Sequence, residues 1–519
     1  MSNRPAGTAS ADAKPKLWSV AGLVRGSTSR VAQLCLSTVI GFLLTPFIVH
    51  SLGPRQYGIW ALAYAFIGYY SLLDLGMSAA VFTHVSYSLG RQEHEETQRV
   101  YSTGLAIFGS CGLILALASV VLALSAAHFY HSWLIGGVIL VVGLSTATSF
   151  PLRVHFGTLN AGSQFEITSG LLMLSLILRA ILTVIVLRMH YGVLALAIVS
   201  AAATMPTNVL VIAATKWRYP FLHVLRARYR RETGGNLIRF GFPVLFGQLA
   251  DRVRLQTDSI TVSFFVGLVA LAHYNIATTL VMYYIDGVAA ITGVIGPVLA
   301  MQQSVRDEQG VRRSLLMGTR VGLVVSGFVL FGLIAWGHAF IQRWMGTQYV
   351  DAYPVLVILA CAVFFDASQS TTINAFYVTF NQKYYAALNG AEAVANLALS
   401  ILLARPFGMI GIALGTLIPA VVVRTLVQPV LIEKRLGLSV RDYWAVSLPT
   451  LLRTAGCLVV PLAITRFWLR PTYPSLILVG GLSTVTFGIA VWGLEFRWFG
   501  ADRLTGGLFL QRPSVSEAD

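Results

Sequence analysis

Charged residues are scarce in this chain. Only 11% of the 519 residues are Asp, Glu, Lys or Arg, whereas 56% are hydrophobic. Ordinary soluble proteins carry about 25% charged residues, and a soluble chain of this length would divide into domains with charged surfaces. Apolar runs of about 20 residues recur from one end to the other, and each is long enough to cross a bilayer as a helix. The composition therefore excludes a soluble protein and predicts an all-α polytopic membrane protein.

Cysteines and metal-binding patterns are also rare. The ten histidines form no HxxxH or HxxEH pattern, and the chain has no Gly-rich phosphate loop. The four cysteines fall inside apolar runs without a metal-type spacing, which argues against disulfides or zinc: Cys35, Cys111, Cys361 and Cys457. We therefore expect no cofactor and no metal. Because no loop is long enough for a nucleotide-binding or enzymatic domain, we expect a secondary transporter or a carrier driven by membrane potential.

The basic residues predict how the chain is oriented in the membrane. Windows of about 19 residues identify about 14 transmembrane helices, and cytoplasmic loops are expected to hold an excess of Lys and Arg. With a cytoplasmic N-terminus, 26 of the 37 cations lie on the inner side and 6 on the outer side, with 5 inside spans. We therefore expect both termini in the cytoplasm. The net charge of +16 is then explained by topology and membrane lipids, and we expect no nucleic-acid partner.

The sequence repeats weakly at an offset of about 215 residues. Leu52-Gly53 matches Val266-Gly267 at an offset of 214, and the Tyr191-Gly192 pair matches Phe407-Gly408 at 216. Transporters are often built from duplicated halves, so we expect two six-helix lobes followed by two extra helices. The predicted division is an N-terminal tail at 1–19, a first lobe at 20–215, a basic linker at 216–238, a second lobe at 239–435, two additional helices at 436–495 and a C-terminal tail at 496–519.

Eleven charged residues lie within predicted spans, where charges are costly. Each costs about 2.5–3.5 kcal/mol at the centre of a membrane helix, even on insertion-based scales. Because lipid exposure would together cost on the order of 30 kcal/mol, we expect them to surround a hydrated interior. They are Asp74, Asp251, Asp258, Asp286, Asp366, Glu392, Arg179, Arg252, Arg254, Arg424 and Arg453.

The seventh predicted helix holds the densest group of these charges. Asp251, Arg254 and Asp258 are spaced i, i+3 and i+7, so they line one helical face. Arg252 and Arg254 repel each other unless an anion visits, and guanidinium groups are suited to phosphate and carboxylate. The alternative, which the sequence leaves open, is an internal ion-pair network. Two roles are also open for Asp74. Its carboxyl group can carry a proton, or it can form a hydrogen bond between helices.

Two segments in the first half of the chain carry a family resemblance. They are the segment from Thr45 to Leu62, TPFIVHSLGPRQYGIWAL, and LLDLG at 72–76. Both resemble the bacterial polysaccharide-export family of oligosaccharide flippases. Asp258, Val266-Gly267 and Tyr274 extend the resemblance into the second half, so that it covers about residues 20–435. The superfamily also contains multidrug extruders and lipid II flippases. The resemblance implies a pair of six-helix lobes around a central cationic cavity that opens alternately inward and outward, in the bacterial inner membrane.

The implied substrate is an undecaprenyl-pyrophosphate-linked oligosaccharide, moved from the inner to the outer leaflet. We expect Arg252 and Arg254 to bind its pyrophosphate, helped by Arg30, Arg179 and Arg424. We expect the acids Asp74, Asp258 and Asp251 to tune the site or to couple transport to protons or sodium. Polysaccharide polymerase and export proteins are the expected protein partners. A lipid II flippase and a cation-coupled multidrug extruder of the same fold are the alternatives.

Overall fold

The computed structural model describes residues 20–74, 76–223, 256–379 and 381–496. Within these ranges the regular secondary structure is helical throughout. The physical reason is that hydrocarbon offers no partner to a peptide group, so a spanning segment must satisfy its backbone hydrogen bonds internally. The prediction of an all-α fold is confirmed for the described part of the chain.

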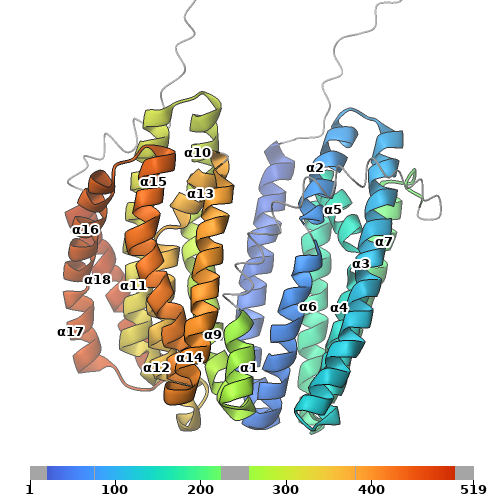
Figure 1. Cartoon of the computed structure of the whole chain (residues 1–519), viewed down its shortest axis with the longest axis horizontal. Coiled ribbons are helices and arrows are strands. Elements are labelled where there is room, and N and C mark those ends of the chain that lie inside the picture. Colours follow the sequence, from blue (N-terminus) through green and yellow to red (C-terminus); the bar gives the residue numbers. More distant parts are fainter. Residues whose placement is uncertain (1–19, 75, 224–255, 380, 497–519) are drawn as a thin grey trace, which may run out of the picture. The chain divides into compact units, whose positions relative to one another are not determined.

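The chain divides into two compact units, of which the first ends at Leu249 and the second begins at Ala250. In the first unit, α1 packs along α6, and α3 packs along α4 (Figure 1). Its described helices are α1 (Val20–Gly68), the 3-10 helix η1 (Tyr69–Asp74), α2 (Met77–Gly90), α3 (His94–Phe129), α4 (Trp133–Ser149), α5 (Arg153–Ala161), α6 (Phe165–Arg188) and α7 (Val193–Arg218).

In the second unit, α12 packs between α9 and α14, and α11 packs against α12 and α16. A π-helical turn, Val423–Val427, follows α14. The described helices are α9 (Leu268–Thr292), α10 (Ile295–Ser304), α11 (Glu308–Trp344), α12 (Ala352–Ala367), α13 (Ser370–Val378), α14 (Gln382–Val422), α15 (Gln428–Leu436), α16 (Val440–Cys457), α17 (Val459–Trp468) and α18 (Tyr473–Val491). A short helical segment at 256–265 precedes α9.

The two units use the same order of helices. A long helix, α3 with 36 residues or α11 with 37, is followed by an interrupted one. In the first unit the interruption separates α4 from the nine-residue α5, and in the second unit it separates α12 from the nine-residue α13. A linker at 216–238 stays a prediction, because most of it lies outside the described residues.

Ten helices in the described residues are long and apolar enough to cross a membrane, or eleven if the bent pair of α4 and α5 is one span. Two of the ten are too long for a single crossing: Thr28–Asp74 has 47 residues and Lys383–Leu436 has 54. At 1.5 Å per residue these would extend ~70 and ~80 Å, against a hydrocarbon core of ~30 Å. The total of about 14 spans stays a prediction, because the span expected near Gln256 lies partly outside the described residues.

Glycines with positive φ break or begin helices at corresponding places in the two units. Gly53 has a φ of 73° within the stretch called α1, and Gly267 has a φ of 114° before α9. A Cβ built on either residue meets no atom within 4 Å. The backbone conformation, and not a lack of space, therefore favours glycine here. The sequence match between Leu52-Gly53 and Val266-Gly267 therefore corresponds to a shared structural feature, a glycine with positive φ where a helix breaks or begins.

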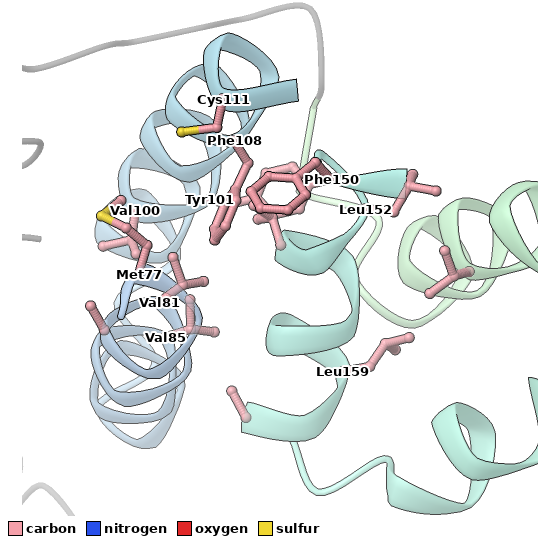
Figure 2. Close-up of a cluster of buried hydrophobic side chains, with 14 of the residues drawn as sticks. Met77, Val81, Val85, Val100, Tyr101, Phe108, Cys111, Phe150, Leu152 and Leu159 are labelled. Carbon is pink, nitrogen blue, oxygen red and sulfur yellow. The ribbon is translucent and has the colours of Figure 1, made fainter. Parts of the chain in front are cut away.

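An apolar core holds together the part of the first unit where helices are interrupted. Met77, Val81 and Val85 of α2 face residues of α3 and α5, as Figure 2 shows. The buried Phe150, between α4 and α5, packs edge-on against Phe108 with ring centroids 5.9 Å apart. This cluster fixes the bend between α4 and α5 against α3.

Close helix packing generates a prediction for Gly322 of α11. A Cβ at this position would lie 2.4 Å from the backbone carbonyl oxygen of Ser368, between α12 and α13. We expect Gly322→Ala to destabilise the protein by about 1–3 kcal/mol through overpacking, measured as a lower thermal unfolding temperature in detergent. Gly481→Ala in α18 is the control, because a Cβ there meets nothing within 4 Å. Equal unfolding temperatures for the two variants would contradict the packing.

Candidate functional site

Asp258 lies in the helical segment 256–265 of the second unit and is 5% exposed. Three hydroxyl groups donate hydrogen bonds to its carboxylate. The Tyr274 hydroxyl of α9 lies 2.8 Å from Oδ2, the Thr416 hydroxyl lies 2.6 Å from Oδ2, and the Ser400 hydroxyl lies 3.4 Å from Oδ1. Ser400 and Thr416 sit on opposite sides of the kink at Gly408 in α14. The kink therefore brings two distant turns of one helix to the same carboxylate.

Asn396 extends this network and leaves an acceptor unused. Its Nδ2 donates to the Thr416 hydroxyl at 2.8 Å. Its Oδ1 is buried and has no hydrogen-bond partner in the described part of the chain. Carboxylate, hydroxyl and amide oxygens are the ligands that hard cations prefer. Asp258 with these neighbours can therefore hold a proton or a small cation.

Arg424 lies in the π-helical turn after α14 and is 1% exposed. Its Nη2 lies 3.0 Å from Oδ1 of Asp366 in α12 and 2.9 Å from Oε2 of Glu392 in α14. The same nitrogen donates to Oδ1 of Asn389 at 3.0 Å. π-Helical turns are rare and frequently mark functional positions. Here the turn aims one cation at two carboxylates inside the unit.

The other terminal nitrogen of Arg424 is also engaged. Nη1 donates to Oε1 of Gln428 at 2.8 Å and to the hydroxyl of Tyr385 at 3.3 Å. The backbone carbonyl of Arg424 accepts from Nε2 of Gln369, beside the interruption between α12 and α13. Arg424 thus joins α12, α14 and the π-helical turn. This geometry favours an internal ion-pair network for Arg424 over the substrate-binding role expected from the sequence, and that role stays a prediction.

A small cavity in the second unit lies between the Asp258 network and the Arg424 network. Its walls include the polar residues Asp258, Asp366, Glu392 and Thr416, together with apolar residues of α9 and α12. Three carboxyl groups line the cavity, and Arg424 pairs with two of them, so acidic groups are in excess around it. No cluster of three or more His, Cys, Asp or Glu side chains suited to a metal ion occurs among the described residues.

In the first unit, two arginines lie over aromatic rings. The guanidinium carbon of Arg30 in α1 is 4.0 Å from the ring centroid of Phe165, at the start of α6. The guanidinium carbon of Arg179 in α6 is 5.9 Å from the centroid of Tyr64. Arg30 is exposed and Arg179 is half-buried. Neither has a carboxylate within ion-pair distance in the ranges that the structure describes, so both can accept an anion.

Asp74 of the first unit is paired with a cation that sequence reasoning did not single out. Its Oδ1 lies 3.2 Å from Nη1 of Arg153, and it accepts a hydrogen bond from the Ser78 hydroxyl at 2.6 Å. Arg153 is one of the 26 cations that the sequence predicts on the inner side of the membrane. Pro151, two residues earlier, is the signal for a helix interruption there. Asp251, Arg252 and Arg254 lie outside the described residues, so their roles stay predictions.

The burial of Arg424 yields a stability prediction. Arg424→Gln leaves Asp366 and Glu392 facing each other without their cation, and breaking a buried pair from one side costs about 3–5 kcal/mol. We expect a much lower unfolding temperature and less protein in the membrane. Adding Asp366→Asn and Glu392→Gln should recover most of that loss, because the neutral set contains no uncompensated charge. Arg405→Gln, at an exposed position of α14, is the control. Wild-type stability of Arg424→Gln would return Arg424 to the candidate substrate ligands.

Comparison with solved structures relates this fold to known transporters. A structure of the lipid II flippase MurJ in an inward closed conformation covers 93% of this chain and 100% of its own, with a TM-score of 0.66 and 15% identity. An inward-facing multidrug resistance MATE family transporter of the MOP superfamily covers 80% of this chain and 98% of its own, with a TM-score of 0.63 and 14% identity. At these identities the similarity shows the fold.

Sequence comparison relates the chain to proteins of polysaccharide synthesis. The "Putative O-antigen transporter" of Shigella flexneri is 22% identical over 418 residues, which cover 78% of this chain and 97% of the relative. The teichuronic acid biosynthesis protein TuaB of Bacillus subtilis is 25% identical over 301 residues, 56% of this chain and 57% of the relative. A family model described as polysaccharide biosynthesis protein matches residues 51–354, more than half of the chain. The chain therefore belongs to this family of polysaccharide biosynthesis proteins.

Proposed function

We propose that this protein is a flippase for an undecaprenyl-pyrophosphate-linked oligosaccharide, which it moves from the inner to the outer leaflet of the bacterial inner membrane by alternating access. The observation that carries the proposal is the pair Arg30 and Arg179, cations on membrane helices that no carboxylate offsets in the described residues. Arg179 is costly within a membrane span unless an anion or water meets it, and Arg30 lies near the end of its span. A lipid-linked diphosphate is an anion that reaches them from within the bilayer.

Physical chemistry explains why such a substrate needs a carrier. Each sugar hydroxyl taken unpaired into hydrocarbon costs several kcal/mol. A hydrated path lined by arginines keeps the headgroup solvated while its lipid tail remains in the bilayer. With the cytoplasm negative, moving two diphosphate charges outward is favoured by roughly 4–5 kcal/mol per 100 mV. Membrane potential therefore supplies a driving force in the proposed direction.

The proposed pyrophosphate ligands are Arg252 and Arg254, with Arg30 and Arg179 as helpers. Two guanidinium groups two residues apart repel each other unless an anion lies between them, and each presents a planar fork that matches phosphate oxygens. Both termini are proposed to be cytoplasmic, which places Arg30 near the side where the substrate is synthesised. Polysaccharide polymerase and export proteins are the proposed partners on the receiving side.

For ion coupling we propose Asp258, with Asp251 as a further candidate. The support is the network of Tyr274, Ser400 and Thr416 hydroxyls around the Asp258 carboxylate and the unused amide oxygen of Asn396. The acidic cavity beside it also favours a cation, as a cation-coupled multidrug extruder would require. The charges of Asp366 and Glu392 are engaged by Arg424 within one unit, so we assign the cavity to a small coupling ion and not to a drug.

The pyrophosphate assignment is tested by Arg252→Ala combined with Arg254→Ala. We expect this variant to abolish flipping, because it removes both proposed ligands, while abundance and topology stay normal. The measurement is complementation of a strain that lacks its polysaccharide flippase, with accumulation of the lipid-linked precursor as the readout. Arg188→Ala, at the exposed end of α6, is the control. Persistent flipping would show the assignment to be wrong, and rescue of a strain lacking its lipid II flippase instead would favour that alternative.

Ion coupling is tested by Asp258→Asn, which removes a charge at nearly constant shape. In proteoliposomes we expect transport to lose its response to an imposed proton or sodium gradient and to retain its response to membrane potential. Asp286→Asn is the matched control, because Asp286 is exposed on the neighbouring α9. An unchanged gradient response in Asp258→Asn would exclude Asp258 as the coupling residue. A wild-type protein that responds to potential alone would exclude ion coupling altogether.

A further inference from the structure

Two interrupted spans of the first unit meet at one ion pair. Asp74 is the last residue of η1, and α2 begins three residues later at Met77. Arg153 is the first residue of α5, which is bent by 40° from α4. Helices α2 and α5 pack against each other. The Asp74–Arg153 pair therefore lies at the interruptions of both spans.

The guanidinium group of Arg153 is held from two sides. Its Nη1 lies 3.2 Å from Oδ1 of Asp74, and its carbon lies 4.1 Å from the ring centroid of Phe150. Phe150 is 1% exposed and is fixed in turn by Phe108, as the cluster in Figure 2 shows. Asp74 is fixed by the hydrogen bond from Ser78. The orientation of the guanidinium plane is therefore set by packed neighbours.

Most of the binding capacity of Arg153 remains unused. A guanidinium group has five N–H donors, and in the described part of the chain Asp74 is the one carboxylate within ion-pair distance of it. The Arg153 side chain is 34% exposed, against 11% for Asp74. An anion can therefore reach the guanidinium edge that Asp74 does not contact. A planar fork of this kind is suited to the paired oxygens of a phosphate group.

The second unit shows that this fold does not need a charge at the corresponding interruption. Ser370 begins α13 as Arg153 begins α5, and Thr292 ends α9 as Asp74 ends η1. The Ser370 hydroxyl donates to the Thr292 hydroxyl at 2.9 Å. A neutral bridge thus joins the two interrupted spans there. A purely structural role for the first unit would not require an exposed cation.

We propose that Arg153 is a further binding residue for the diphosphate of the substrate, positioned by Asp74 and Phe150. Asp74 is then a positioning residue and not an ion carrier. This inference rests on the proposed function, because it takes the lipid-linked diphosphate as the ligand. The proposal places an anion site at the helix interruption of the first unit and none at the corresponding interruption of the second unit.

The test compares binding of undecaprenyl pyrophosphate to the full chain in nanodiscs of phosphatidylcholine. Asp74→Asn combined with Arg153→Gln removes both charges and keeps groups able to form a neutral bridge. We expect its affinity to fall at least about tenfold, since a charge-assisted hydrogen bond is lost, with an unchanged unfolding temperature. Arg153→Lys, which keeps the charge and loses the fork, should fall between this variant and wild type. Arg99→Gln in α3, whose partners Glu95 and Glu96 lie on its own helix, is the control for removing a cation.

The outcomes separate this inference from the proposed function. Wild-type affinity in the doubly substituted protein would overturn the inference and leave the proposed function standing. If the doubly substituted protein loses binding of phosphatidylglycerol but keeps its affinity for undecaprenyl pyrophosphate, Arg153 binds bulk lipid. That result would also overturn the inference. A wild-type protein that does not bind undecaprenyl pyrophosphate would overturn the proposed function and this inference together. Asp74→Asn alone should weaken binding less than the double substitution, as a positioning role requires.

Discussion

The cost of leaving polar groups unpaired in hydrocarbon governs most of this structure. Backbone groups meet this constraint by forming helices, and charged side chains meet it by finding partners or water. Arg424 shows the first solution, since two carboxylates, two amides and a hydroxyl surround it inside one unit. Arg30 and Arg179 show the second, because their charges are left open beside aromatic rings. The same constraint thus produces both the internal ion-pair network and the candidate anion sites.

The two units build the same succession of helices and use it differently. The second unit surrounds Asp258 with hydroxyl groups and gathers carboxylates beside it. The first unit leaves arginines open and joins its interrupted spans with the Asp74–Arg153 ion pair, where the second unit uses two hydroxyls. This asymmetry fits an arrangement in which the first unit adds the proposed diphosphate contacts of Arg30, Arg153 and Arg179. The second unit holds the proposed coupling residue Asp258 together with the proposed ligands Arg252 and Arg254.

Helix interruptions are the structural feature that makes these sites possible. A continuous helix presents its side chains at fixed intervals of 3.6 residues, which would keep Ser400 and Thr416 of α14 more than four turns apart. The kink at Gly408 folds them onto one carboxylate. In the first unit, the bend after α4 turns Arg153 toward Asp74. Both sites therefore depend on local departures from the helical geometry that the membrane otherwise enforces.

The sequence by itself determined the helical membrane fold, because long apolar runs with few charges have one stable form in a bilayer. It also identified Asp74, Asp258 and Arg424 as residues that need partners. Tertiary structure decided which partners they have. Ser400, Thr416, Asp366 and Arg153 lie far from them in sequence or on other helices, and contacts between helices depend on kinks and packing that periodicity does not encode. For that reason Arg424 became an internal cation and Arg153 a candidate ligand only once the helices were placed.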